Sequence, residues 1–334
     1  MVHPVMEGFR WQDGERLIAF GRGALADAHE LLGNDYLLLT TPRAAESAPA
    51  VAEHAGRIEH VGAGRVDELA GDLLDSVRAA GAELFVALGG GRVVDTAKSL
   101  ASALPGTRAA AVPTTLSAAE MTSGHRRARG AAQDTPGVRP AIVLNDPALS
   151  ASQPVAALAA SAANALAHAY EGPMTVSASP VPTLAAHEAA RLIAGAWNGP
   201  EPDRDALALG ALLSGYAIDG PGYGLHHILS QTLVRLAGAG HGPANAAMLP
   251  HTTGALRRRR PDRVDRLAVA IGADPAEIAA RLAARAGARR LRDIGVERDK
   301  LDECAEAAAA RPDLARIPPA PDEQEIRALY EAAW

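Results

Sequence analysis

An asparagine and a histidine lie four residues apart in the stretch SAANALAHAYE, residues 161–171. The alanine-rich stretch predicts a helix, and residues at positions i and i+4 lie one above the other on the same helix face. Asn164 and His168 are therefore expected to point in the same direction. An aspartate at position 164 would make this pair half of a metal site, so the asparagine needs an explanation.

Further histidines follow within a short region of the sequence: His226, His227, His241 and His251. We expect the helix that carries the adjacent His226 and His227 to point only one of them inward. Histidines from three helices can converge on a divalent metal ion, for which imidazole nitrogen suits zinc or iron. The residues alone favour the alternative, in which each histidine is a separate core or surface residue.

Three consecutive glycines, Gly89, Gly90 and Gly91, follow a short apolar run over residues 84–88 and precede a helical pattern. Glycines let the backbone turn sharply and let a phosphate approach the amide groups. The helix N-terminus adds partial positive charge where a pyrophosphate would bind. The motif is neither GxGxxG nor the GxxxxGK[ST] phosphate loop. A tight turn without a ligand is the alternative, but it does not need three glycines, so we expect phosphate binding.

Other polar groups lie near the glycines in the predicted topology. The segment AVPTTLSAAEMT, residues 111–122, follows the next strand and is rich in hydroxyl groups. Hydroxyls at the carboxyl end of a strand suit a nucleotide or a nicotinamide amide, although serine and threonine also cap helices. Asp95 and Lys98 lie in the first two turns of the helix after the glycines. Either is a candidate for orienting a cofactor, and a surface position is the alternative for Lys98.

Alternating strands and helices must position the glycines. Apolar runs predict strands, and helical spacing predicts the helices between them. The expected strands cover 36–41, 57–61, 84–88, 109–112 and 141–144, and the expected helices cover 66–80 and 93–104. This alternation is typical of βαβ units, so we predict an α/β domain with a parallel, Rossmann-like sheet over residues 1–150.

The histidines belong to a second region, residues 151–334, which is almost wholly helical in pattern. Gly and Pro separate the helical segments. The expected helices cover 155–172, 183–197, 205–219, 224–237, 243–258, 262–271, 275–287, 297–310 and 322–333. We therefore predict an all-α domain, and a cleft between the two domains is the expected ligand site.

Composition excludes several classes of protein. The 334 residues contain 33 Lys+Arg and 39 Asp+Glu, a net charge of −6, so no basic surplus indicates a nucleic-acid partner. The basic run Arg257–Arg260 is interpreted as a solvated helix end. The single cysteine, Cys304, excludes an intrachain disulfide framework. Neither a signal-peptide pattern nor a bilayer-length apolar run is visible, so we expect a cytoplasmic protein without a membrane partner.

In combination these motifs resemble the iron-containing (group III) alcohol dehydrogenase superfamily, whose fold is related to that of dehydroquinate synthase. The resemblance rests on GGGRVVDTAK at 89–98, PTT at 113–115, EMT at 120–122, DP at 146–147, the Asn164/His168 helix, HGPANA at 241–246 and LPH at 249–251. Within the superfamily the chain is similar to maleylacetate reductases. That similarity rests on TTPR at 40–43, NALAH at 164–168, GLHH at 224–227 and the terminal IRALYEAAW at 326–334.

The resemblance implies NAD(P)H-dependent reduction of a small-molecule substrate at a carbonyl or enone-like carbon, in a homodimer. The family's metal-binding positions, carried over to this chain, are Asn164, His168, His227 and His241. A neutral amide is a poor ligand, so we expect no tightly held iron; if a metal is bound, the three histidines are its ligands. Otherwise these histidines are expected to donate hydrogen bonds or, when protonated, to place positive charge near an acidic substrate.

The resemblance also implies a location for each part of NAD(H) or NADP(H). The pyrophosphate is expected on the glycines, the adenosine half near residues 40–43, and the nicotinamide along residues 114–117, facing the helical domain. Arg126, Arg127 or Arg129 is a candidate partner for a substrate carboxylate, with a solvent-exposed loop as the alternative. The expected cofactor-binding residues are Thr40, Thr41, Arg43, Gly89, Gly90, Gly91, Arg92, Asp95, Lys98, Thr114, Thr115 and Ser117.

Several residues depart from the family pattern. Arg92 replaces the serine that usually follows the glycines, where it would either contact a phosphate or occupy part of the pyrophosphate space. Ala118 and Ala119 replace a Gly-Ser pair, and Ile228 and Gln231 replace a usual lysine and histidine. Two alternatives therefore stay open: a redox-inactive member acting as a lyase, cyclase or ligand-binding protein, and a metal-dependent alcohol dehydrogenase.

Overall fold

The computed structural model describes residues 7–334. These residues form two compact units, which divide between Ser152 and Gln153. Residues 1–6, on which part of the expectation about a signal peptide rests, lie outside the described residues. None of the helices within 7–334 combines the length and the apolar character that a membrane span requires.

The first unit is built on a seven-stranded sheet in the order β1-β2-β7-β6-β5-β3-β4. The strands are β1 (Phe9–Asp13), β2 (Arg16–Phe20), β3 (Tyr36–Thr40), β4 (Ala55–His60), β5 (Leu84–Gly89), β6 (Arg108–Pro113) and β7 (Ile142–Asn145). Only β1 and β2 pair in antiparallel fashion; all other neighbouring strands are parallel. The predicted fold class is confirmed, and the β1–β2 hairpin is an addition to it.

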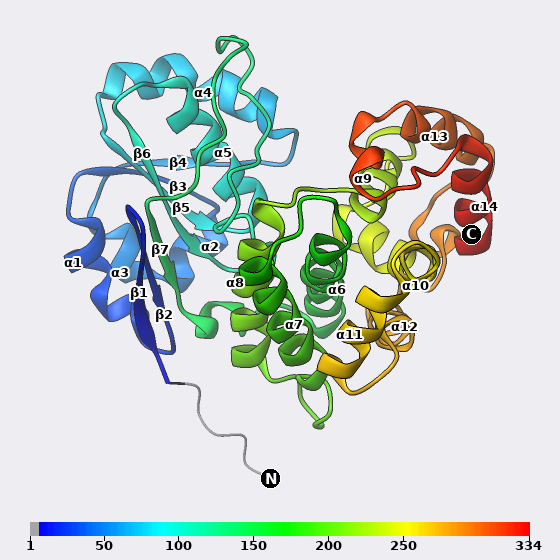
Figure 1. Ribbon diagram of the computed structural model, residues 1–334. Coiled ribbons are helices and arrows are strands. Elements are labelled where there is room, and N and C mark those ends of the chain that lie inside the picture. Colours follow the sequence, from blue (N-terminus) through cyan, green and yellow to red (C-terminus); the bar gives the residue numbers. More distant parts are fainter. Residues whose placement is uncertain (1–6) are drawn as a thin grey trace. The chain divides into compact units, whose positions relative to one another are not determined.

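Helices cover both faces of this sheet (Figure 1). They are α1 (Ala28–Leu32), α2 (Pro42–Ser47), α3 (Pro49–Ala52), α4 (Val66–Ala80) and α5 (Gly91–Ala103), with a short 3-10 helix, η1 (Ala24–Asp27). Successive residues of a strand point to opposite faces. Leu37 and Phe85 pack with α4 and α5 in one buried cluster, whereas Leu38 and Val86 pack with α1–α3 in the other. The sheet is therefore buried on both faces, as parallel sheets are.

The second unit is helical. Its α-helices are α6 (Val155–Glu171), α7 (Pro180–Gly195), α8 (Arg204–Asp219), α9 (Leu225–Leu236), α10 (His241–Arg259), α11 (Pro261–Ile271), α12 (Pro275–Arg285), α13 (Lys300–Ala309) and α14 (Glu323–Ala333). Each predicted helix is present, with ends that differ by a few residues. Helix α7 begins earlier than expected, at Pro180, because proline suits the first position of a helix.

Helix α6 is central to this unit and is buried along almost its whole length. It packs against α7, α8, α10 and α12. Its side chains are mostly alanine, so neighbouring backbones approach closely and little volume separates them. A helix enclosed on all sides fixes the direction of each of its polar side chains, including Asn164 and His168.

Close packing between α7 and α8 predicts opposite effects for two glycine substitutions. A Cβ atom at Gly210 in α8 would lie 2.7 Å from Cγ1 of Ile193, whereas a Cβ at Gly254 in α10 would meet nothing within 4 Å. Gly210→Ala should lower the free energy of unfolding by roughly 1–3 kcal/mol, because overpacking outweighs helix propensity. Gly254→Ala should raise it by up to about 1 kcal/mol. Urea denaturation measures both, and equal effects would contradict this packing.

Candidate active site

The carboxyl ends of β3, β5 and β6 lie side by side in the sheet of the first unit. Thr40 is in register with Leu88, and Gly89 is in register with Pro113. The chain order reverses here, because β4 lies beyond β3 on one side and β6 lies beyond β5 on the other. Open α/β sheets bind ligands at such a switch point, outside the carboxyl ends of the strands.

The three glycines join β5 to α5 at this position. Gly90 is the N-cap residue of α5, with φ of −80°, and none of the three has a positive φ. Their small size is needed for another reason: a Cβ at Gly91 would lie 2.9 Å from Cβ of Ser117, and one at Gly90 would lie 3.2 Å from Thr115. The glycines therefore allow the segment after β6 to pack directly against the start of α5. Backbone amides in the first turn of a helix have no partner within the helix, which makes this turn suited to an anion.

The structure places Arg92 and Lys98 differently from each other. The Arg92 guanidinium donates through Nη1 to the carbonyl oxygen of Gly62 at 3.0 Å, so the side chain extends toward the segment after β4. Lys98 is fully buried, and its ammonium lies 2.8 Å from the Asp95 carboxylate. The alternative of a surface position for Lys98 is therefore wrong.

Lys98 holds the loop that follows β6. Its Nζ donates to the carbonyl oxygens of Ala119 at 3.0 Å and Gly124 at 2.7 Å. Asp95 and Lys98 thus help to fix this loop, and their contact with a cofactor stays a prediction. Ala118 within the loop has φ of +61°, a conformation that residues other than glycine rarely adopt. The alanine occupies the position where the family resemblance implies a glycine.

The hydroxyl groups predicted to contact a cofactor also have structural roles. Thr40 is buried and donates to the carbonyl oxygen of Leu88 at 2.9 Å, which joins β3 to β5. The Thr41 hydroxyl caps α2 by accepting from the amide of Ala44. Arg43 donates to the carbonyl oxygen of Ser152 at 2.7 Å. Thr114, Thr115 and Ser117 are partly exposed in the loop beside the glycines, and their cofactor contacts stay predictions.

The arginine-rich loop over 124–137 contains neither helix nor strand. Arg126 approaches Asp67 of α4 at 4.0 Å, and Arg129 pairs with Asp72 of the same helix. Arg127 donates to the Thr135 hydroxyl at 3.0 Å. All three guanidinium groups thus have protein partners within the first unit, which favours the exposed-loop alternative over a substrate contact.

The histidines come together in the second unit. The rings of His168 from α6 and His227 from α9 stack with centroids 4.7 Å apart and an interplanar angle of 13°. The Tyr223 ring lies 4.5 Å from that of His227 and 5.8 Å from that of His168. His241 begins α10 and is exposed, and its proximity contributes to lowering the pKa of both His168 and His227. Asn164 is buried one helical turn before His168.

His226 corrects one sequence prediction, because it and His227 are both buried. Its ring nitrogens lie 2.8 Å from the Thr252 hydroxyl and 2.9 Å from the Asn245 side-chain oxygen. Helix α9 packs against α10 and α13 and also contacts α6, so two adjacent side chains can both face protein. His226 thus has a packing role beside the candidate site.

Burial controls the charge of these histidines. It lowers the pKa of His226 and of His227 to about 3, and the pKa of His168 falls well below its ordinary value for the same main reason. All three imidazoles are therefore neutral at neutral pH. Burial therefore disfavours the expected positive charge on His168 and His227, because transfer of a charge out of water costs free energy.

None of the four candidate metal positions carries a carboxylate. Across the described part of the chain, no group of three or more His, Cys, Asp or Glu residues is placed to hold a metal ion. Asn164 adds a neutral amide where a carboxylate would be needed.

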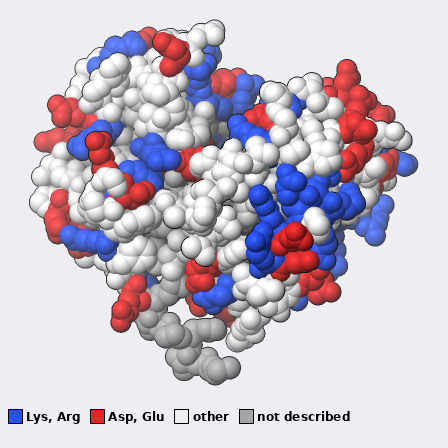
Figure 2. All heavy atoms as spheres, viewed as in Figure 1, with Lys and Arg blue, Asp and Glu red and all other residues white. Residues whose placement is uncertain are grey.

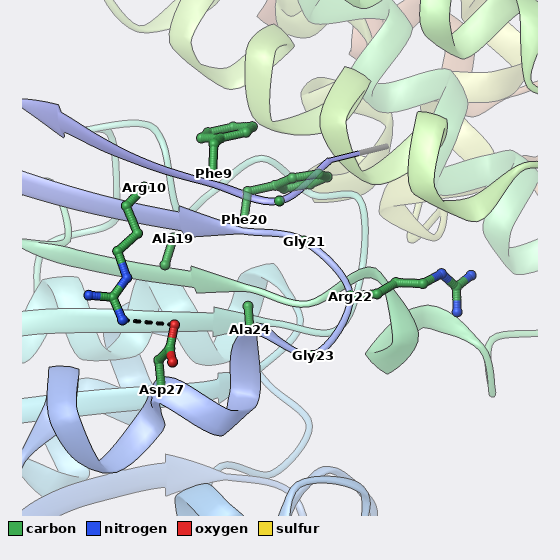
Figure 3. A pocket seen from close by; sticks show the side chains of 10 residues that line it. Phe9, Arg10, Ala19, Phe20, Gly21, Arg22, Gly23, Ala24 and Asp27 are labelled. Atoms are coloured by element: carbon green, nitrogen blue, oxygen red, sulfur yellow. Dashed lines mark ion pairs between the residues drawn. The ribbon is translucent and has the colours of Figure 1, made fainter. Parts of the chain in front are cut away.

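A separate pocket of about 310 Å³ lies at the end of the β1–β2 hairpin (Figure 3). The Phe9 and Phe20 rings stack at 5.3 Å, and Arg10 pairs with Asp27 at 2.9 Å. Arg10 also pairs with Glu30, so its charge is already compensated. The sequence analysis did not predict this pocket, and none of the predicted site residues lines it.

The basic run Arg257–Arg260 does not form an isolated positive patch. Arg257 pairs with Asp274, and both Arg258 and Arg259 pair with Glu325. On the face drawn in Figure 2, basic side chains gather in a patch on the right, with a smaller group of acidic side chains among them. The ion pairs support the interpretation of this run as a helix end.

Models of known protein families match both units. The model of the C-terminal region of the Fe-containing alcohol dehydrogenase family matches residues 158–334, and the iron-containing alcohol dehydrogenase model matches residues 16–147. Maleylacetate reductase 1 from Rhodococcus opacus is 33% identical, with 78% of this chain and 75% of the relative covered. Maleylacetate reductase from Rhizobium sp. (strain MTP-10005) is 29% identical, with 98% of each chain covered. The crystal structure of maleylacetate reductase from Agrobacterium tumefaciens superimposes with a TM-score of 0.83, at 29% identity, covering 98% of this chain and 99% of that one.

Glu120, which the sequence analysis gave no role, predicts a pH dependence of stability. Burial raises the pKa of its carboxyl to about 7, although the nearby Lys98 acts in the opposite direction. Because the folded state holds this proton more tightly than the unfolded state, stability is lost as pH rises from about 4.5 to 7. Glu120→Gln removes the titrating carboxyl. The unfolding free energy of this variant minus that of the wild type should therefore increase by roughly 3 kcal/mol between pH 4.5 and pH 8.

Urea denaturation at several pH values measures this difference. Glu83→Gln, at an exposed position in the same unit, is the matched control and should show a difference that hardly changes with pH. A constant difference for Glu120→Gln would show that folding does not raise the pKa of Glu120.

Proposed function

The chain belongs to the iron-containing alcohol dehydrogenase family, and from that premise we propose that this oxidoreductase is an NAD(P)H-dependent reductase of the maleylacetate reductase type. Its substrate is a small carbonyl or enone-like molecule that bears a carboxylate. The observation that carries the proposal is the glycine turn at the sheet's switch point, packed against Thr115 and Ser117, in a chain whose named relatives are maleylacetate reductases.

The proposal assigns residues 1–150 to the dinucleotide and residues 151–334 to the substrate. Amides at the start of α5 would bind the pyrophosphate, and the absence of Cβ atoms at Gly90 and Gly91 lets the segment after β6 pack against this turn. Thr40, Thr41 and Arg43 would lie near the adenosine half, and the residues of 114–117 near the nicotinamide. A bound nicotinamide supplies or accepts the hydride. A homodimer in the cytoplasm is part of the same proposal.

On the substrate side, we assign hydrogen bonding to Asn164, His168, His227 and His241. Neutral, buried imidazoles suit this role because each presents one donor and one acceptor nitrogen. Proton transfer by a positioned histidine contributes typically 10²–10⁴-fold to a rate. We further propose that the protein holds no metal tightly, since Asn164 offers a neutral amide where a carboxylate would be needed.

Turnover and cofactor binding test the proposal together. Purified protein should oxidise NADH or NADPH in the presence of maleylacetate or a simple aldehyde, followed by absorbance. Gly91→Ala should weaken NADH binding at least tenfold, because the new methyl group collides with Ser117 beside the pyrophosphate position. Gly62→Ala, whose Cβ meets nothing within 4 Å, is the matched control and should bind as wild type does. Binding of neither NADH nor NADPH would support a redox-inactive protein instead.

Metal content tests the proposal about Asn164. Protein purified without chelator should contain far less than one iron or zinc per chain by elemental analysis. Asn164→Asp restores a carboxylate beside His168 and should tighten zinc binding by roughly tenfold or more. The exposed Asn198→Asp adds the same charge elsewhere and should not. Stoichiometric metal in the wild-type protein would favour the metal-dependent alcohol dehydrogenase.

A further inference from the structure

The Arg92 side chain crosses the carboxyl edge of the sheet. Arg92 lies in the first turn of α5, and its guanidinium donates through Nη1 to the carbonyl oxygen of Gly62 at 3.0 Å. Gly62 follows β4, and the amide of the preceding Val61 donates to the carbonyl oxygen of Thr40 at 2.8 Å. Because β3 lies between β5 and β4 in the sheet, the guanidinium is held beside the carboxyl end of β3.

Arg92 keeps an uncompensated positive charge at this edge. The side chain is exposed, and no carboxylate among residues 7–334 forms an ion pair with it. Its neighbours differ in this respect, because Arg65 pairs with Asp67 at 2.6 Å and Lys98 pairs with Asp95 at 2.8 Å. A guanidinium has five N–H groups, and the contact with the Gly62 carbonyl uses only one of them. Arg92 therefore has both charge and donors available for an anion.

The segments after β3 and β4 carry no acidic residue at this edge. In dinucleotide-binding folds, an Asp or Glu near the adenosine accepts a hydrogen bond from the ribose 2′-hydroxyl, whereas an arginine accommodates a 2′-phosphate. Here β3 ends at Thr40 and is followed by the sequence TPR over 41–43, and residues 61–65 after β4 read VGAGR. The position suited to a ribose-binding carboxylate thus has Arg92 beside it instead.

The proposed orientation of the cofactor brings the adenosine ribose to the same side of the glycine turn. The nicotinamide is assigned to residues 114–117, which follow β6, and the pyrophosphate to the start of α5. Since β6 and β3 flank β5 on opposite sides, a dinucleotide that crosses this turn extends its adenosine half toward β3. The Arg92 guanidinium extends in that direction too, toward Gly62.

We propose that Arg92 is a specificity-determining residue that binds the 2′-phosphate of NADP(H), so that the protein prefers NADPH to NADH. This inference rests on the proposed function and specifies its cofactor. The 2′-phosphate is a phosphate monoester with a charge of about −1.5 to −2 at pH 7, and a guanidinium can donate two parallel hydrogen bonds to its oxygens. NADH offers only a hydroxyl there, which leaves the arginine charge unpaired.

Calorimetric titration of the full chain with NADPH, NADH and adenosine 2′,5′-bisphosphate tests the proposal. Wild type should bind NADPH at least about tenfold more tightly than NADH, and added salt should reduce this ratio. Arg92→Gln removes the charge but keeps a donor for the Gly62 carbonyl. It should raise the dissociation constants of NADPH and of the bisphosphate about tenfold, and that of NADH less than about twofold. Arg92→Lys keeps the charge without the planar fork and should be intermediate.

Arg108→Gln is the matched control. Arg108 is exposed at the first position of β6, at the amino edge of the same sheet, so the variant removes one positive charge far from the candidate site. It should retain the wild-type ratio of the two dissociation constants. A similar loss of NADPH binding in this variant would assign the preference to net charge and overturn the role of Arg92.

Two further results would overturn the inference: equal binding of NADPH and NADH by wild type, or equal weakening of both by Arg92→Gln. The latter would place the arginine on the pyrophosphate, which both dinucleotides share. If NADPH binds with the Arg92-dependent preference but no carbonyl compound is reduced, the inference stands and the proposed reductase is wrong. Binding of neither dinucleotide contradicts both proposals.

Discussion

A single buried carboxylate fixes the geometry of the helical unit's polar centre. Oε1 of Glu171 accepts a hydrogen bond from the His226 amide at 2.6 Å, and Oε2 lies 2.6 Å from Nδ1 of His227. One side chain thus holds the end of α6 and the start of α9 together. Burial makes the link strong, because water does not compete for the carboxylate oxygens, and it keeps the imidazoles neutral for the same reason.

The α/β unit uses a cation in a comparable way. The Lys98 ammonium holds the loop after β6 through the carbonyl oxygens of Ala119 and Gly124, with Asp95 balancing its charge. The same loop packs on Gly91, where no side chain larger than hydrogen fits. Each unit therefore places its candidate site beside a buried ionisable group that contacts backbone atoms. Such groups are expensive to bury without hydrogen-bond partners, which makes the surrounding geometry intolerant of change.

Local patterns in the sequence predicted much of this arrangement. The i, i+4 spacing of Asn164 and His168, and the apolar run before Gly89, depend only on short-range periodicity. The β1–β2 hairpin was also predictable, since Asp13 and Gly14 form a typical hairpin signal between alternating residues. The burial of both His226 and His227 was not, because it depends on which helices enclose α9. Glu171 was unpredictable for the same reason: its partner lies 55 residues away in the sequence.

Ala118 has a consequence for the motions of the α/β unit. Its backbone occupies a region that costs an alanine about 1–2 kcal/mol relative to ordinary conformations. The loop remains there because neighbouring contacts, above all those of Lys98, outweigh that cost. Any event that loosens those contacts would let this segment relax before the rest of the sheet does. Slow hydrogen exchange elsewhere in the unit would then coexist with early local opening at this one loop.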